Sequence, residues 1–158
     1  MKKIIASVTA TLLVLVAGCT SALQPKEREP VIDTNLIGTW LVRQAELSGK
    51  NFPVPSTFEL KISGTRYHAG FPGNAALAND YGKIVLFGDE VAGQAARVDV
   101  VGEDGPNKGK RFPAIYRLNE KSNGRELEMC YDLSEKERPS EFVSREGTML
   151  LRVTYTKK

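Results

Sequence analysis

The residue types that most often carry catalysis or bind metals are few in this sequence of 158 residues. It contains one histidine, His68, and two cysteines, Cys19 and Cys130. A histidine-dependent triad or a zinc site would have to be built on His68, with further ligands from Cys130 or carboxylates. No paired spacing of such ligands is present. We therefore expect His68 to be a strand residue at a rim or surface, and we expect no catalytic residue, no metal site and no cofactor.

Cys130 stands between two carboxylates on an alternating stretch, with Glu128 and Asp132 two positions away on either side. In an extended strand all three share one face. Neighbouring carboxylates raise the pKa of a thiol, which disfavours a reactive thiolate. The carboxylates themselves lie roughly 13 Å apart in a strand, too far to act together as a catalytic pair. We favour an outer, solvated face with a small cysteine in it; a polar lining inside a cavity is the alternative.

Cys19 stands in a different context, at the end of an N-terminal stretch with three parts. A basic start, Met1-Lys2-Lys3, precedes an apolar run over residues 4–16, and small residues then lead to the cysteine in Val16-Ala17-Gly18-Cys19. The apolar run is short for a transmembrane helix. This order resembles a bacterial lipoprotein signal peptide. An ordinary signal peptide, or an uncleaved anchor with an incidental cysteine, is the alternative.

The lipoprotein resemblance implies a lipid anchor and an address. It implies cleavage after Gly18, diacylglycerol on the Cys19 thiol and acylation of the new amino terminus. Several acyl chains together anchor a protein far more firmly than one. The protein would then be exported and held on a membrane. Thr20, rather than Asp, follows the cysteine and favours the outer membrane, facing the periplasm, if the source has two membranes.

Cleavage would also change the charge and the cysteine count. Loss of Lys2 and Lys3 lowers the formal net charge from +3 to +1. This balance gives no general attraction to nucleic acid, and we expect no nucleic-acid partner. With Cys19 acylated, Cys130 would have no partner for an intrachain disulfide, so the domain must be stable without one.

The sequence divides into three regions: a signal peptide over residues 1–18, an acylated cysteine and flexible tether over 19–35, and one domain over 36–158. The tether is polar and contains Pro25 and Pro30, which disfavour a packed helix. The domain shows short alternating runs and no long amphipathic helix. Turns such as residues 48–51 separate them. The eight predicted strands cover residues 39–47, 57–63, 65–69, 83–87, 94–101, 111–118, 125–133 and 148–156.

Eight antiparallel strands joined by short turns predict an all-β fold. Closing them into a single up-and-down barrel removes the exposed edges that a flat sheet would leave. A barrel of this size is either filled by side chains or holds one small ligand. No alternation of strands and helices suggests a parallel sheet.

Several motifs of the domain, taken together, resemble a family. They match the uncharacterised lipocalin-like family often called planctomycete-type, and the first of them also matches the G-x-W signature of lipocalins. The resemblance implies a small, often exported β-barrel and no established reaction, ligand or catalytic residue. The motifs are Gly38-Thr39-Trp40, Asp104-Gly105-Pro106-Asn107-Lys108-Gly109-Lys110, Ile115-Tyr116-Arg117-Leu118, Leu127-Glu128-Met129-Cys130 and Arg138-Pro139-Ser140-Glu141-Phe142.

The first motif predicts a plug at one end of the barrel. Gly38 lets the chain approach closely, and Trp40 is large enough to fill the end. In lipocalins an arginine near the end of the last strand stacks over this tryptophan. By resemblance Arg152 takes that role here, and Arg138 is the competing candidate. The other interpretation makes Trp40 a ligand contact.

Three functions compete for the domain. The first is a membrane-tethered, non-catalytic barrel that binds a small apolar or amphipathic ligand. The second is a solid-cored structural or protein-interaction module of the cell envelope. The third is an enzyme, which the sparse catalytic residue types disfavour. A continuous cavity of a few hundred Å3 would favour ligand binding, and a filled core would favour the second function. The predicted cavity residues are Phe58, Leu60, Tyr116, Met129 and Tyr131.

Overall fold

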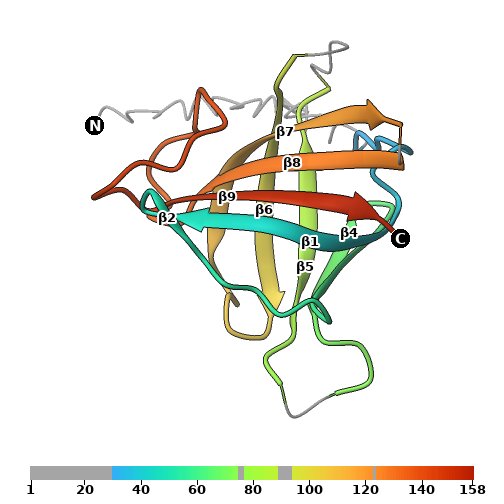
Figure 1. The fold of residues 1–158 in the computed structure, drawn as a ribbon. Helices are drawn as coiled ribbons and strands as arrows, with labels where there is room; N and C mark the ends of the chain where they lie inside the picture. The colour runs from blue at the N-terminus through green and yellow to red at the C-terminus, as the bar shows by residue number, and fades with distance from the viewer. Residues whose placement is uncertain (1–29, 75–76, 89–93, 123) are drawn as a thin grey trace, which may run out of the picture.

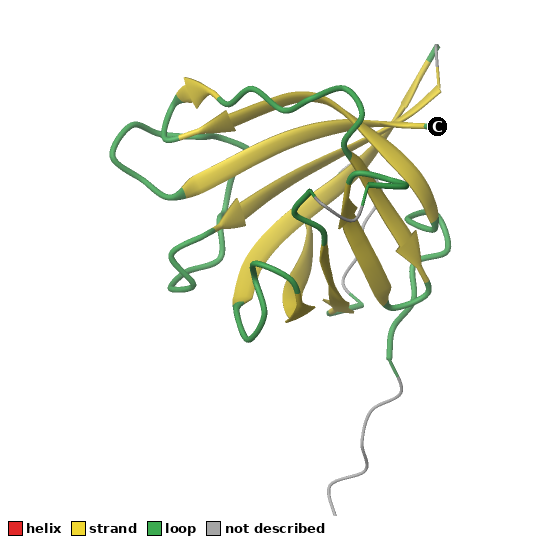
Figure 2. Cartoon of the chain, turned by 90° about the horizontal axis from the view of Figure 1, so that it is seen from below, coloured by secondary structure: helices red, strands yellow, loops and turns green. Residues whose placement is uncertain are grey.

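The computed structural model describes residues 30–74, 77–88, 94–122 and 124–158 (Figure 1). The described part of the chain is built from strands and loops, with no helix (Figure 2). Cys19 and the predicted signal peptide lie outside the described residues. The strands are β1 (Gly38–Leu47), β2 (Lys50–Asn51), β3 (Glu59–Ser63), β4 (Arg66–Gly70), β5 (Asp80–Leu86), β6 (Ala96–Asp104), β7 (Arg111–Lys121), β8 (Gly124–Asp132) and β9 (Leu150–Lys157).

The strands close into an antiparallel barrel. Each strand from β3 to β8 pairs with its successor in the chain, β1 pairs with β3, and β9 returns to pair with β1. The closing seam runs from Trp40 opposite Lys157 to Leu47 opposite Leu151. The prediction of an all-β, eight-stranded up-and-down barrel is confirmed. The structure adds one short strand to these eight. β2, of two residues, pairs with β1, where the sequence predicts only a turn.

Alternation along the strands separates an inner face from an outer face, apart from a register shift in β1 between Val42 and Gln44. In β6, Ala96, Val98 and Val100 join the buried core. Arg97 points outward and is exposed. Because side chains alternate across a strand, the sequence pattern fixes which residues face inward.

One end of the barrel is packed solid. Trp40 is fully buried, and its indole nitrogen donates a hydrogen bond to the Leu36 carbonyl at 2.8 Å. Tyr116, with 2% of its surface exposed, has its hydroxyl 3.2 Å from a carboxylate oxygen of Asp33. The segment before β1, which holds Asp33 and Leu36, thus crosses this closed end, beside the C-terminus in Figure 1.

Neither predicted arginine stacks on Trp40. The cation over the indole is Lys157, whose ammonium lies 5.3 Å from the ring centroid. Arg152 points to the outer face, because it stands between the inward residues Leu151 and Val153, and it pairs with Glu128 at 2.7 Å. Arg138 pairs with Asp99 at 2.5 Å, also outside the barrel. The predicted arginine contact is therefore wrong.

The chain between β8 and β9, residues 133–149, leaves the ends of these strands (Figure 1, orange to red) and forms a covering segment, which contacts the outside of the sheet through Arg138 on Asp99 and Phe142 on Arg117. Three carboxylates in this region are almost fully buried: Asp99, Glu128 and Asp132. The segment itself contacts Asp99 through Arg138 and Asp132 through Ser134. Glu128 is held between Arg117 at 2.6 Å and Arg152 at 2.7 Å. The Glu128 ion pairs join β7, β8 and β9, whereas the covering segment is fastened to the sheet by the ion pair of Arg138 with Asp99.

Cys130 lies beneath the same segment and is fully buried. Its thiol lies 3.5 Å from the Val143 carbonyl oxygen. Burial, more than the nearby carboxylates, raises the pKa of the thiol to about 11. The face shared by Glu128, Cys130 and Asp132 is therefore outside the barrel, as favoured, but it is covered rather than solvated.

Candidate functional site

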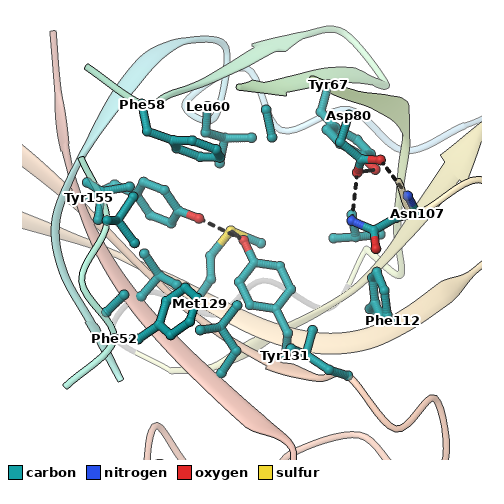
Figure 3. A pocket seen from close by; sticks show the side chains of 18 of the residues that line it. Phe52, Phe58, Leu60, Tyr67, Asp80, Asn107, Phe112, Met129, Tyr131 and Tyr155 are labelled. Atoms are coloured by element: carbon teal, nitrogen blue, oxygen red, sulfur yellow. Dashed lines mark hydrogen bonds between the residues drawn. The ribbon is translucent and has the colours of Figure 1, made fainter. Parts of the chain in front are cut away.

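The other end of the barrel is hollow. A cavity of about 420 Å3 opens between the β1–β3, β4–β5 and β6–β7 connections and the end of β8 (Figure 3). It is lined by Val42, Ala45, Phe52, Pro53, Val54, Pro55, Phe58, Leu60, Ile62, Tyr67, Ala69, Phe71, Ala78, Asp80, Ile84, Val100, Asn107, Phe112, Met129, Tyr131, Leu133, Leu151, Val153 and Tyr155.

The lining is apolar with a few polar groups at fixed places. Among the described lining residues, Asp80 is the one acidic side chain, and there is no Lys, Arg or His. The remaining polar side chains are Asn107 and three tyrosines, Tyr67, Tyr131 and Tyr155. Small-molecule sites in proteins have this composition: an apolar wall gives affinity and a few polar groups fix orientation.

The polar groups fall into two clusters, of which the first surrounds Asp80. The Tyr67 hydroxyl donates to its carboxylate at 2.6 Å. Asn107 donates its backbone N–H at 3.0 Å and its side-chain amide at 3.2 Å. Burial first, and then the hydrogen bond to Asp80 and its charge, raise the pKa of Tyr67, so this hydroxyl stays protonated and donates. Figure 3 shows this cluster at one edge of the cavity.

Two glycines allow this cluster to form. A β-carbon at Gly82 would lie 2.7 Å from the Tyr67 ring and 1.9 Å from the Val101 carbonyl oxygen, so only glycine admits the ring that reaches Asp80. A β-carbon at Gly102 would lie 2.0 Å from the Asn107 carbonyl oxygen. Because Gly102 has no side chain, the β6–β7 turn can lie close against β6, and this places Asn107 beside Asp80.

The second cluster joins Tyr131, Tyr155 and Met129. The Tyr131 hydroxyl lies 3.2 Å from the Tyr155 hydroxyl and 2.9 Å from the Met129 sulfur. Burial is the main reason that the pKa of Tyr155 rises to about 12 and that of Tyr131 rises well above its usual value. Both hydroxyls are therefore neutral at ordinary pH, and this part of the cavity carries no charge.

Four of the five predicted cavity residues, Phe58, Leu60, Met129 and Tyr131, line the cavity. Tyr116 does not: it is buried at the closed end, near Asp33. The alternation of β7 correctly predicts that Tyr116 faces inward. It does not predict how far along the barrel axis the side chain lies, and this depth separates the filled end from the hollow one.

The sequence interpretation missed the Asp80 cluster. The sequence patterns single out neither Tyr67 nor Asp80, and they include Asn107 only as part of the motif from Asp104 to Lys110. Asp80 is thirteen positions from Tyr67 and twenty-seven from Asn107. The single signal in the sequence is an acidic residue at the start of a strand whose next alternating positions, Gly82, Ile84 and Leu86, are non-polar.

His68, the residue considered above for catalysis and zinc binding, makes its contacts outside the cavity. The His68 ring stacks on Tyr81 with centroids 4.4 Å apart, and its Nε2 lies 2.9 Å from the Asn79 side-chain oxygen. Within the described ranges, no group of three or more His, Cys, Asp or Glu side chains is placed to hold a metal ion. Nor does that part of the chain contain a helix with the length and hydropathy needed to cross a membrane.

A second hollow, of about 480 Å3, lies within the covering segment. It is bordered by charged and polar residues, including Asp132, Ser134 and Arg138. These side chains already have partners within the protein: Asp132 accepts hydrogen bonds from Ser134, and Arg138 pairs with Asp99. The barrel cavity is therefore the stronger candidate for a ligand.

Comparisons with protein-family models, with curated proteins and with solved structures found no match to the chain.

Proposed function

We propose that the protein is a membrane-tethered, non-catalytic barrel that binds one small apolar or amphipathic molecule. The observation that carries this proposal is the cavity of about 420 Å3 at the open end of the barrel. Its volume falls within the range of roughly 300–1,000 Å3 that is typical of small-molecule sites.

The driving force for binding is the removal of apolar surface from water. The ligand would contact aromatic and aliphatic side chains such as Phe58, Leu60 and Met129. Each Å2 of apolar surface that leaves water contributes about 25 cal/mol, so even a molecule of modest size gains affinity from this wall. The cavity also argues against the solid-cored envelope module, in which these same residues would fill the space.

Native mass spectrometry tests this function most simply. The chain from Thr20 to Lys158, which includes every described residue, is expressed without a lipid anchor and purified without detergent. We expect a fraction of the protein to carry an additional apolar molecule, which solvent extraction would release and identify. Ala69→Trp places an indole in the cavity and should carry none. If no preparation of the unmodified chain carries a molecule, and none can be loaded with simple apolar compounds, the proposal fails.

The tether is proposed from the sequence, since Cys19 lies outside the described residues. After removal of the expected signal peptide, acyl chains on Cys19 would hold the barrel at a membrane surface through the polar stretch that follows the cysteine. Cys19→Ser should move the protein from the membrane fraction to the soluble fraction or leave it unprocessed. Cys130→Ala removes the other thiol and should leave fractionation unchanged. Processing and membrane association that survive Cys19→Ser would disprove the lipid anchor.

A further inference from the structure

The described wall of the cavity carries a negative charge and no positive charge. Asp80 contributes a carboxylate to the wall, and no described residue of the lining contributes a positive charge. The other polar groups of the wall are an amide and neutral tyrosine hydroxyls. An anionic head group entering this cavity would lose its hydration and meet a like charge with no cation to offset it.

Asp80 is also held in place to accept a hydrogen bond. Its Oδ2 accepts hydrogen bonds from the Tyr67 hydroxyl and the Asn107 side-chain amide, and its Oδ1 accepts one from the Asn107 backbone. An ionised carboxylate has about four lone-pair positions, so these three donors leave room for one more. The three existing bonds fix the orientation of the group, so little conformational freedom is lost when a further donor arrives.

The rest of the wall suits an apolar body. Figure 3 places Asp80 and Asn107 at one edge of the cavity, with Phe52, Phe58 and Tyr155 on the far side. A molecule with one polar end can therefore lie across the cavity, with that end at Asp80 and its carbon chain against the aromatic rings.

We propose that the ligand is an amphipathic amine, with one protonated amino group bound to Asp80 and an apolar tail across the cavity. This inference rests on the proposed ligand-binding function and adds the chemical class of the ligand. A charge-assisted hydrogen bond from an ammonium group to a carboxylate is about twice as strong as a neutral one. The same carboxylate excludes fatty acids, so Asp80 sets specificity by attraction and by repulsion.

The test compares three molecules with the same ten-carbon chain: decylamine, decanol and decanoate. Each is titrated into the Thr20–Lys158 protein by isothermal calorimetry at pH 7, below its critical micelle concentration. We expect decylamine to bind at least about tenfold more tightly than decanol, and decanol more tightly than decanoate. Asp80→Asn should reduce the preference for the amine to within about threefold. Asp104→Asn removes an equivalent charge from an exposed position at the end of β6 and should preserve the original order.

The outcomes separate the two proposals. If decanol or decanoate binds and decylamine shows no preference, the amine inference is overturned while ligand binding stands. A preference for the amine that persists in Asp80→Asn overturns the role of Asp80. If none of the three molecules binds, the amine inference is overturned, and the proposed function fails with it when no preparation carries, or can be loaded with, another apolar molecule. The comparison of the three molecules on the unmodified protein needs no variant, so it decides the amine preference even if Asp80→Asn does not fold.

Discussion

The two ends of the barrel are made by the same strands but differ in what fills them. At the closed end, Trp40 of β1 and Leu127 of β8 are fully buried in contact with the core. At the open end the same strands present Ala45 and Tyr131 to a cavity. In β1 a register shift between Val42 and Gln44 allows both Trp40 and Ala45 to face inward. The ends differ in how completely the inward side chains fill the space and in the segment that crosses the closed end.

The two ends therefore have different roles: the closed end stabilises the fold, and the open end provides the cavity. Tight packing, the Trp40–Leu36 hydrogen bond and ion pairs on the outer face such as Arg152–Glu128 stabilise the fold at sites away from the cavity. The open end leaves part of its space unfilled, although lining residues such as Leu60 and Met129 belong to the same buried core. Substitutions at the closed end should change stability, and substitutions in the cavity should change binding.

The largest effect on stability is expected from Trp40→Ala. It empties the packed end and removes the hydrogen bond to Leu36, which should lower the free energy of unfolding by about 3–5 kcal/mol, as for other large-to-small core substitutions. Urea unfolding followed by circular dichroism measures this loss. Trp40→Phe retains part of the volume and should cost less. If Trp40→Ala left the unfolding free energy unchanged but abolished ligand binding, the tryptophan would belong to the ligand site and the two tasks would be reversed.

A smaller, pH-dependent effect is expected from Asp132→Asn beneath the covering segment. Burial alone raises the pKa of this carboxyl, but hydrogen bonds from Ser134, Glu137 and Lys136 outweigh it and lower the pKa below its usual value. A depressed pKa stabilises the folded state above the unfolded-state pKa of about 4, and that stability is lost as the pH falls through the folded-state pKa.

The substitution should therefore cost about 1–3 kcal/mol at neutral pH, and the difference from the unmodified protein should shrink below about pH 4. Urea unfolding at a series of pH values checks both statements. Asp104→Asn, on an exposed residue, should show neither effect. A cost for Asp132→Asn that stays constant from pH 7 to pH 2 would show that the carboxylate charge is not what fastens the segment.

The smallest effect on stability is expected from Ala69→Trp, which adds an indole to the cavity. Because the space is empty, the free energy of unfolding should change by no more than about 1 kcal/mol, less than overpacking costs in a filled core. Binding of decanol should weaken at least tenfold. Val85→Trp places the same ring on the outer face of β5 and should leave binding unchanged. Unweakened binding in Ala69→Trp would place the ligand outside this cavity.

The sequence correctly predicts which face of a strand a side chain occupies, but it does not predict how far along the barrel axis that side chain lies. Polar–apolar alternation correctly separated Leu127, Met129 and Tyr131 from Glu128 and Cys130, because a strand has only two faces. The position of a side chain along the barrel axis depends on strand tilt and stagger, which alternation does not contain. For this reason Tyr116 was assigned to the cavity but lies at the closed end.

The same limit explains the other two differences. The cation over Trp40 is Lys157 because the register of β1 and β9 places these two residues opposite each other, and register across the closing seam joins the two ends of the domain. The Asp80 cluster gathers residues from β4, β5 and the β6–β7 turn, and it depends on close approaches at Gly82 and Gly102. None of these pairings follows from local pattern.

The most direct test of the cavity as a ligand site uses the two methionines of the Thr20–Lys158 chain. Met129 lines the cavity, with 3% of its surface exposed, whereas Met149 is 50% exposed and lies outside it. With 13C-labelled methionine methyl groups, decanol is titrated and both signals are followed by NMR. We predict a saturable shift of the Met129 signal and an unchanged Met149 signal. An unchanged Met129 signal at saturating decanol, or a shift of Met149 alone, would contradict ligand binding inside the barrel.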